Sequence, residues 1–344
     1  MAHDYHSEGI RQVGIDPGPA VIVTGAAGFI GSHLVERLLS DGYRVGGLDN
    51  LDPWYSPALK RANVAAAGKT PGYRFEAVDL LEESHQRLVA RFRGAKAVYH
   101  LAGRPGVQAS WGDDFADTLD QNVLATQRVL EAARDAGVSR VVLASSSSVY
   151  GDSAADGSSR VAPVSPYGAS KAAAEHLAGV YGRQGLDVVM LRYFTVFGPR
   201  QRPDMAFNRL FAACLDGPAF RRRGDGTQRR EFTFVTDVVA ATVAAGTAPA
   251  DRVAGRAFDV GGGVVTSLSE VTASVAVVSG VRPRVLPTSP GAGDPRLTMA
   301  DLGPTTEALG WRPTTSLSDG LAAQWAWQYQ LAPPVEPTAI ARAS

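Results

Sequence analysis

The chain has 344 residues, of which 45% are hydrophobic and 20% are charged. This length and composition fit a globular protein with a sizeable core, and domains of about 100–200 residues predict two of them. Lys and Arg total 34, as do Asp and Glu, so the formal net charge is +0 and binding of nucleic acid driven by net charge is excluded.

Residues 1–17 carry charges and histidine without an apolar stretch, so we expect a loose leader and not a secretion signal. No apolar run approaches the ~20 residues of a membrane span, so no membrane contact is expected. Cys214 is the single cysteine, so no intrachain disulfide forms, and the six histidines lack metal-ligand spacing. We therefore expect a cytoplasmic protein without a metal site.

Strands and helices alternate through the first 195 residues. Apolar runs predict strands at 21–24, 43–48, 73–78, 96–101, 139–145 and 187–193, and the segments between them predict helices at 29–40, 82–92, 118–136 and 167–182. This order is typical of an α/β fold, a Rossmann-type doubly wound parallel sheet with helices on both faces.

Pro and Gly become denser after about residue 195, which indicates a smaller and less regular C-terminal α/β domain. Both domains are expected to be discontinuous. We assign 18–195 plus about 232–262 to the first domain, and 196–231 plus about 263–334 to the second.

A glycine-rich turn, Gly25-Ala26-Ala27-Gly28-Phe29-Ile30-Gly31, lies between the first strand and the first helix. Such glycines allow a tight turn and a close approach of the backbone to a pyrophosphate, while the helix N-terminus offers N–H groups. The spacing GxxGxxG is a weak signal alone, because a structural turn is about equally compatible with it.

Acidic residues at strand ends strengthen the dinucleotide interpretation. Asp49 follows the glycine turn by about 20 residues, where a carboxylate accepts the ribose hydroxyls of NAD. No arginine follows it directly to bind a 2′-phosphate, so we predict NAD and not NADP. Asp79 ends the third predicted strand, where it serves either the adenine or a helix cap.

Tyr167 and Lys171 form a Tyr-x-x-x-Lys pair at the start of a predicted helix, and this spacing places them on one face. An ammonium group near a phenol lowers the phenol's pKa, so Tyr167 is a candidate base. A serine run at 145–148 precedes the pair, and one of its hydroxyls is expected to share the substrate proton. Only four residues of the chain are lysines, which adds weight to Lys171.

Taken together, these motifs resemble the extended short-chain dehydrogenase/reductases, specifically the nucleotide-sugar epimerases and dehydratases. The similarity runs from about 20 to 325 through TGAAGFIGSHL, HLAG, SPYGASK, LRYFTVFGP and GDGTQRREFTFVTDV. The segments DNLDPWYSPALKRA and RYFTVFGPRQRPDMA are similar to those of UDP-glucuronate 4-epimerases.

The resemblance implies a tightly held NAD in the first domain and a nucleotide-sugar substrate, most simply a UDP-sugar, in the second. It also implies a homodimer built from helices 118–136 and 167–182, and it implies individual site residues. It implies Tyr167, Lys171 and Ser146 as catalytic residues. The implied NAD contacts are Gly25, Gly28, Phe29, Ile30, Gly31, Asp49, Asn50, Asp79, Leu80, Leu101, Ala102, Gly103, Asn122, Tyr167, Lys171 and Tyr193. The implied substrate contacts are Ser147, Ser148, Phe194, Thr195, Arg202, Met205, Arg223, Arg230 and Arg296.

The expected activity is that of an NAD-dependent nucleotide-sugar 4-epimerase, with UDP-glucuronate converted to UDP-galacturonate through a 4-keto intermediate. Tyr167 removes the O4 proton, assisted by Ser146, and the hydride returns to the opposite face of the sugar. Ser147, Ser148 and Thr195 are candidates for holding the C6 carboxylate, or serve only as turn hydroxyls.

Three departures from the resemblance keep the sugar open. The dehydratases carry an Asp-Glu pair where Ser147 and Ser148 stand, which weighs against elimination. A diphosphate-binding arginine is replaced by Gly291, with Arg296 nearby, and Gln108 stands where relatives have arginine. The alternatives are a UDP- or dTDP-hexose 4-epimerase, a related decarboxylase or dehydratase, and a non-catalytic NAD-sensing protein.

Overall fold

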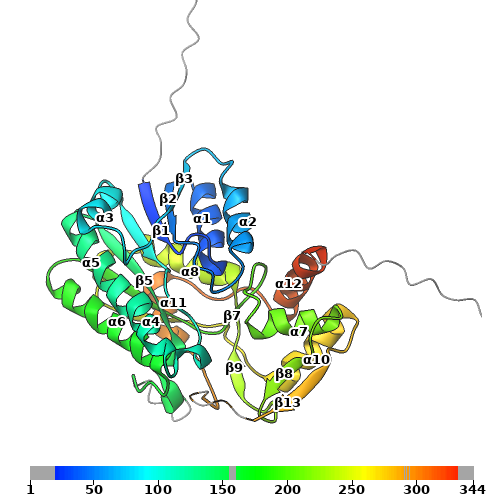
Figure 1. The fold of residues 1–344 in the computed structure, drawn as a ribbon. Coiled ribbons are helices and arrows are strands. Elements are labelled where there is room, and N and C mark those ends of the chain that lie inside the picture. The colour runs from blue at the N-terminus through cyan, green and yellow to red at the C-terminus, as the bar shows by residue number, and fades with distance from the viewer. Residues whose placement is uncertain (1–19, 155–159, 290, 292, 294, 332–344) are drawn as a thin grey trace, which may run out of the picture.

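A seven-stranded, fully parallel sheet forms the centre of the molecule, with the strand order β11-β6-β5-β4-β1-β2-β3 (Figure 1). The structure is a computed structural model, which describes residues 20–154, 160–289, 291, 293 and 295–331. The predicted leader 1–17 lies outside the described residues. The sheet strands are β1 (Ala20–Thr24), β2 (Arg44–Asp49), β3 (Tyr73–Ala77), β4 (Ala97–His100), β5 (Arg140–Ser146), β6 (Asp187–Tyr193) and β11 (Ala257–Val260).

Helices cover both faces of this sheet. One face carries α1 (Phe29–Ser40), α2 (Pro57–Ala67) and α8 (Val235–Thr247), and the other carries α3 (His85–Phe92), α5 (Ala125–Asp135) and α6 (Pro166–Arg183). Each face has its own apolar core, because successive residues of a strand point to opposite sides. In β1, Val21 and Val23 enter one core and Ile22 enters the other. The predicted Rossmann-type fold is therefore confirmed.

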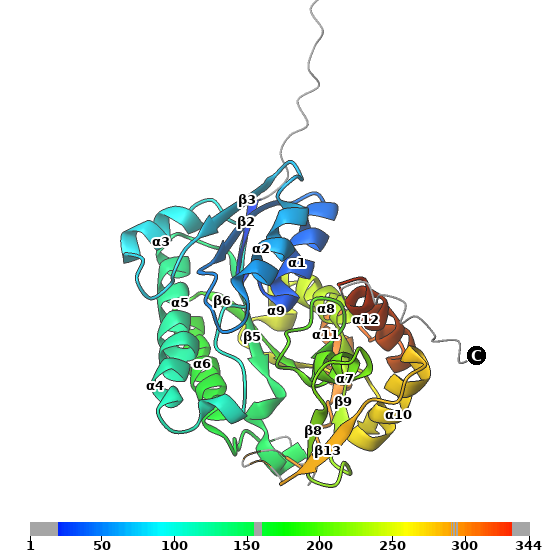
Figure 2. The same ribbon diagram turned by 45° about the vertical axis from the view of Figure 1, so that its right-hand side comes forward.

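A smaller group of elements lies beside the carboxyl ends of the sheet strands (Figure 2). It contains the strand pairs β8 (Phe220–Arg223) with β13 (Val285–Thr288) and β9 (Arg229–Glu231) with β12 (Val265–Ser267), and β7 (Val196–Phe197) pairs with β10 (Thr233–Phe234) at its boundary. Its helices are α7 (Ala206–Cys214), α10 (Leu268–Ser279) and α12 (Leu317–Leu331). Two short helices, α9 (Ala250–Val253) and α11 (Leu302–Leu309), flank β11.

Two helix predictions need correction. The predicted helix 118–136 is α4 (Asp114–Leu119), a π-helical turn (Asp120–Leu124) and α5, so it begins earlier and changes its hydrogen bonding in the middle. The helix α2 was missed, although Ser56 followed by Pro57 and an alanine-rich run is a helix-start pattern. Among the described residues, no helix has the length and apolar character needed to cross a membrane.

Candidate active site

A cleft of about 350 Å³ opens at the carboxyl ends of the sheet strands, where parallel α/β sheets place their ligands. It lies across the change of strand order between β1 and β4. Most of the predicted site residues line it: Gly25, Gly28, Phe29, Ile30, Gly31, Asp49, Asn50, Leu80, Leu101, Ala102, Gly103, Ser146, Ser147, Ser148, Tyr167, Lys171, Tyr193, Phe194, Thr195, Arg202 and Met205.

The glycine turn has the form that a pyrophosphate requires. Gly25 has a φ of +71°, and a Cβ atom there would lie 2.7 Å from the backbone nitrogen of Ala102. The helix α1 begins directly after Gly28, whose position carries no capping side chain. The first N–H groups of α1 therefore remain available for an anion such as the diphosphate of a dinucleotide.

Asp49 is 8% exposed and lies at the end of β2. Its carboxylate accepts hydrogen bonds from the backbone nitrogens of Ala27 at 3.2 Å and Leu51 at 2.8 Å. Lys60 of α2 is also buried, and its Nζ lies 3.5 Å from Asp49 Oδ1. This cation was not considered in the sequence analysis, and it partly offsets the carboxylate charge that was expected to repel a 2′-phosphate.

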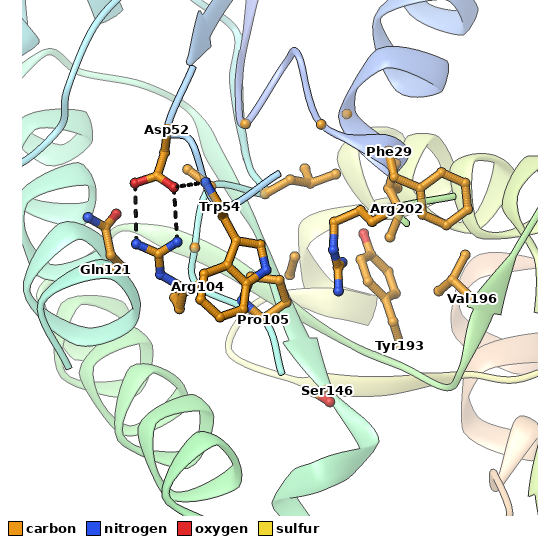
Figure 3. A pocket seen from close by; sticks show the side chains of 18 of the residues that line it. Phe29, Asp52, Trp54, Arg104, Pro105, Gln121, Ser146, Tyr193, Val196 and Arg202 are labelled. Carbon is orange, nitrogen blue, oxygen red and sulfur yellow. Dashed lines mark hydrogen bonds and ion pairs between the residues drawn. The ribbon is translucent and has the colours of Figure 1, made fainter. Parts of the chain in front are cut away.

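Two loops meet across one end of the cleft through Arg104. Its guanidinium donates two hydrogen bonds to Asp52, at 3.0 and 3.2 Å, and one from Nε to Asp117 at 2.5 Å. The same group lies 4.7 Å from the centre of the Trp54 ring. Figure 3 shows the Arg104 and Trp54 side chains next to each other. The loop after β2 is thereby fastened to the loop after β4, and both border the glycine turn.

The residues at the end of β5 hold the N-terminal half of α6. Ser165 caps α6 by accepting a hydrogen bond from the backbone nitrogen of Gly168 at 3.1 Å. Lys171 Nζ donates to the carbonyl oxygen of Ala144 at 3.0 Å. A Cβ atom at Gly168 would lie 2.4 Å from the Ser148 carbonyl oxygen, so glycine is needed beside Tyr167 for the helix to approach this closely.

Burial raises the pKa of Tyr167, and two influences oppose it: a hydrogen bond with Ser146 and the positive charge of Arg202. The sequence analysis considered only Lys171 as a cation near Tyr167, and the structure adds Arg202. Burial also lowers the pKa of Lys171 to about 8, opposed by the charge of Glu175. Lys171 therefore remains mainly a cation at neutral pH and loses its proton at a lower pH than an exposed lysine.

The predicted carboxylate-binding hydroxyls follow two neighbouring strands, Ser147 and Ser148 after β5 and Thr195 after β6. Ser147, Ser148 and Thr195 line the cleft together with Arg202. Ser146 also accepts a hydrogen bond from the backbone nitrogen of Ser148 at 3.1 Å, so its hydroxyl serves the local turn as well as Tyr167. The cleft therefore offers neutral donors and the guanidinium of Arg202, which is also paired with Asp204 at 3.0 Å, and it holds no acid at 147 or 148.

Five predicted residues do not line the cleft: Asp79, Asn122, Arg223, Arg230 and Arg296. The carboxylate of Asp79 accepts from Asn50 Nδ2 at 2.9 Å and from the backbone nitrogen of Leu81 at 2.8 Å, so it holds a loop. Asn122 is 1% exposed and lies in the π-helical turn, where its amide bonds both backbone groups of Arg104. Asp79 and Asn122 therefore hold loops that line the cleft and do not line it themselves.

The three arginines lie on the smaller group of elements. Arg223 is on β8 and Arg230 is on β9. Arg296 lies beside β9, since its backbone carbonyl oxygen accepts a hydrogen bond from the backbone nitrogen of Arg229 at 2.9 Å. Arg230 and Arg296 are thus on adjacent segments, as a shared diphosphate contact requires. A Cβ atom at Gly291 would lie 2.7 Å from Gln108 Nε2, so the two departures from the family pattern are neighbours in space.

The sequence analysis missed the cleft residues on the loop after β2, on α2 and on the loop after β4. The lining residues not predicted include Asp52, Trp54, Tyr55, Lys60, Arg104, Pro105 and Gln121. Their position in the sequence could have predicted them. The segments directly after Asp49 and Gly103 follow the carboxyl ends of two strands of the sheet, where ligands of such sheets bind. Tyr55 Oη is buried without a partner among the described residues, which is an expected condition for an atom awaiting a ligand.

Residues 21–261 match the model of the NAD dependent epimerase/dehydratase family. The chain belongs to this family. It is 39% identical over 311 residues to a UDP-glucose 4-epimerase of Mycolicibacterium smegmatis, covering 88% of this chain and 96% of the relative. It is 32% identical over 311 residues to a UDP-glucuronate 4-epimerase of Thermodesulfobacterium geofontis, covering 89% and 95%.

Among solved structures, the UDP-glucuronic acid 4-epimerase from Bacillus cereus in complex with UDP-glucuronic acid and NAD is similar, with a TM-score of 0.86 and 37% identity. The match covers 91% of this chain and 99% of that one. The resemblance seen in the sequence is therefore confirmed, and NAD is the cofactor of this epimerase. The glycine turn, the uncapped α1 N-terminus and Asp49 fit that dinucleotide in the cleft.

Proposed function

We propose that this epimerase interconverts UDP-glucuronate and UDP-galacturonate by inversion at C4. The observation that carries the proposal is that Ser147, Ser148, Thr195 and Arg202 line the same cleft as Tyr167, with the two serines directly after Ser146, the hydrogen-bond partner of Tyr167. Three neutral hydroxyl donors and one cation suit a carboxylate at C6 of a sugar whose C4 hydroxyl faces the phenol.

Each catalytic residue has one task in this proposal. Tyr167 Oη takes the proton from the sugar O4 and later returns it, while the Ser146 hydroxyl shares that proton. Lys171, as a cation fixed to the Ala144 carbonyl, favours the ionised phenol and binds ribose hydroxyls. NAD supplies the hydride acceptor and donor at C4.

The hydroxyl donors also prevent a side reaction. A 4-keto uronate is a β-keto acid, which loses carbon dioxide when the breaking C–C bond aligns with the carbonyl π system. Hydrogen bonds from Ser147, Ser148 and Thr195 hold the carboxylate out of that alignment. Because 147 and 148 carry no acid, the chain also lacks the groups that elimination of water from a hexose needs.

The test is NMR analysis of the products formed from UDP-glucuronate by the purified holoenzyme. We expect UDP-galacturonate as the main product without added reductant. Tyr167→Phe is the matched control, because it removes only the proton acceptor. It should retain NAD and lose about 10²–10⁴-fold in turnover. A UDP-pentose as the main product, or undiminished turnover in the Phe variant, would contradict the proposal.

A second candidate is a UDP-hexose 4-epimerase. The relative from Mycolicibacterium smegmatis favours it, as does the absence of arginine at 108 and 291. The same experiment with UDP-glucose separates the two, because a carboxylate-binding site should turn over the uronate more efficiently. Faster inversion of UDP-glucose would favour the second candidate.

We also propose a homodimer, a cytoplasmic location and the domain division given above. Exposed apolar side chains lie on the predicted dimer helices, namely Phe115, Leu119 and Leu124 before α5 and Val180 on α6. The lone cysteine is free, so the chain needs no oxidising compartment. In the domain division, β11 of the 232–262 segment joins the dinucleotide sheet beside β6.

A further inference from the structure

Three consecutive residues at the end of β5 hold three residues of α6 that are spaced one turn apart. Ser146 bonds Tyr167, the Ala144 carbonyl accepts from Lys171, and Ser145 Oγ donates to Glu175 Oε1 at 2.5 Å. The first two contacts belong to the catalytic residues described above. The third contact, between Ser145 and Glu175, has no part in that mechanism, although it belongs to the same series of contacts between β5 and α6.

Glu175 is 9% exposed at its side chain and forms a two-point ion pair with Arg192 of β6. Arg192 Nε donates to Oε1 at 2.9 Å and Nη2 donates to Oε2 at 2.7 Å. Arg192 Nη1 also donates to Tyr150 Oη at 2.7 Å. Both carboxylate oxygens are therefore used, and the charge is held at one fixed place one helical turn from Lys171.

The cluster continues toward the smaller group of elements. Tyr150 Oη donates to Asp259 Oδ1 at 2.7 Å, and Asp259 Oδ2 accepts from the backbone nitrogen of Asp301 at 3.0 Å. Asp301 caps α11. A single buried hydrogen-bonded chain thus runs from the helix that carries Lys171 to the segment beside the predicted diphosphate arginines.

We propose that Glu175, held by Ser145 and Arg192, is a positioning residue for catalysis: it fixes the register of α6 on β5 and supplies the negative charge that keeps Lys171 a cation. This inference rests on the role proposed for Lys171. Buried ion pairs often do not increase the stability of a protein. The proposal gives the buried Glu175–Arg192 pair a function in catalysis instead.

The electrostatic surroundings of Lys171 support this assignment. Burial lowers its pKa to about 8, and Glu175 is the carboxylate that raises it. On β4, His100 has its pKa lowered by burial to about 3 and is therefore neutral. Tyr167 on α6 and Tyr193 on β6 are neutral phenols with raised pKa values, and Arg192 is bound to Glu175. Among these groups, Glu175 alone supplies a negative charge that favours the proton on Lys171, and the Ala144 carbonyl is the remaining contact that does so.

The decisive test titrates Lys171 directly by NMR of Cε-labelled lysine in the holoenzyme. Because the chain has only four lysines, four resonances are expected, and Lys171→Arg identifies one of them. The wild-type midpoint should lie near 8. Glu175→Gln should lower it by on the order of one pH unit or more, and Glu175→Asp should restore most of the difference.

The matched control is Asp187→Asn, which breaks a buried Arg–carboxylate pair between β5 and β6, Arg140 with Asp187 at 2.5 Å. Both substitutions leave a buried arginine without its carboxylate and should lower Tm, but only Glu175→Gln should move the Lys171 midpoint. If Glu175→Gln does not fold, the double variant Glu175→Gln/Arg192→Met removes both charges and should shift the midpoint in the same direction.

An unchanged midpoint in the Gln variant, or in the double variant when the single one does not fold, would overturn the proposal, as would an equal shift in the Asn control. This titration needs no sugar, so its result is independent of the substrate assignment. A second readout is the alkaline limb of kcat, which should move to lower pH with the Lys171 midpoint. If the Lys171 midpoint shifts but the alkaline limb of kcat does not, Lys171 does not act as a cation in turnover. That result would contradict the proposed mechanism, whereas the effect of Glu175 on Lys171 would stand.

Discussion

At the scale of single residues, the cleft depends on charges placed where burial makes them effective. Asp49 is buried, accepts two backbone hydrogen bonds and lies beside the buried Lys60. We propose that the carboxylate selects a ribose with a free 2′-hydroxyl, since a 2′-phosphate would meet its negative charge. Lys60 is the opposite influence, and cofactor choice follows from the balance between them.

Asp49→Asn is expected to shift cofactor preference toward NADP, because it removes the repulsive charge and leaves the Lys60 ammonium in place. We expect NADP affinity to rise by about tenfold or more, equivalent to about 1.4 kcal/mol, while NAD affinity falls. Calorimetric titration of NAD-free protein measures both. Asp49→Asn/Lys60→Gln is the control and should lose the gain; an equal gain in both variants would show that Lys60 plays no part.

At the scale of elements, the cleft is made by loops that follow parallel strands and are fastened to one another by Arg104. This residue reaches Asp52 after β2 and Asp117 on α4, and its backbone is held by Asn122 in the π-helical turn. A π-helical turn widens the helix locally and is common at functional sites. Here it brings the Asn122 amide to the loop that borders the dinucleotide end of the cleft.

Arg104→Ala should increase the rate of NAD loss, because the loops after β2 and β4 lose their direct link while the glycine turn and Asp49 are unchanged. We expect about tenfold faster exchange of bound NAD, measured by chasing with labelled NAD, with little change in the pH profile of kcat. The control Arg134→Ala breaks an ion pair on the surface of α5. Equal exchange rates in Arg104→Ala and the wild type would contradict this function of the link.

At the scale of the whole molecule, two apolar cores on opposite faces of one sheet support the cleft at its edge. Burial on both faces explains why β5 is buried at every position and why its last residues can hold catalytic groups rigidly. On the outside, α4, the π-helical turn and α6 present Phe115, Leu119, Leu124 and Val180 to solvent. Several exposed apolar side chains on the helices predicted to pair are consistent with the proposed dimer interface.

Leu124→Asp should therefore convert the proposed dimer into a monomer, because an unpaired charge in an apolar interface is costly to desolvate. Leu124 is 46% exposed in the single chain. Sedimentation analysis of the holoenzyme measures the change. The control Val277→Asp lies on α10 at a side chain 83% exposed and should leave the mass unaltered. A wild-type protein that sediments as a monomer would exclude this assembly.

The sequence by itself determined the parallel sheet, the glycine turn, Asp49 and the Tyr167–Lys171 pair. These are local signals: apolar runs of strand length, glycine where the backbone must turn, and a spacing of four on a helix. Only the tertiary structure showed that the charge of Arg202 acts on Tyr167, that Lys60 faces Asp49 and that Glu175, one helical turn from Lys171, is paired with Arg192. These contacts join residues from different strands, helices and loops. Such residues come close together only when the chain has folded, so no periodicity along the sequence could predict the distances between them.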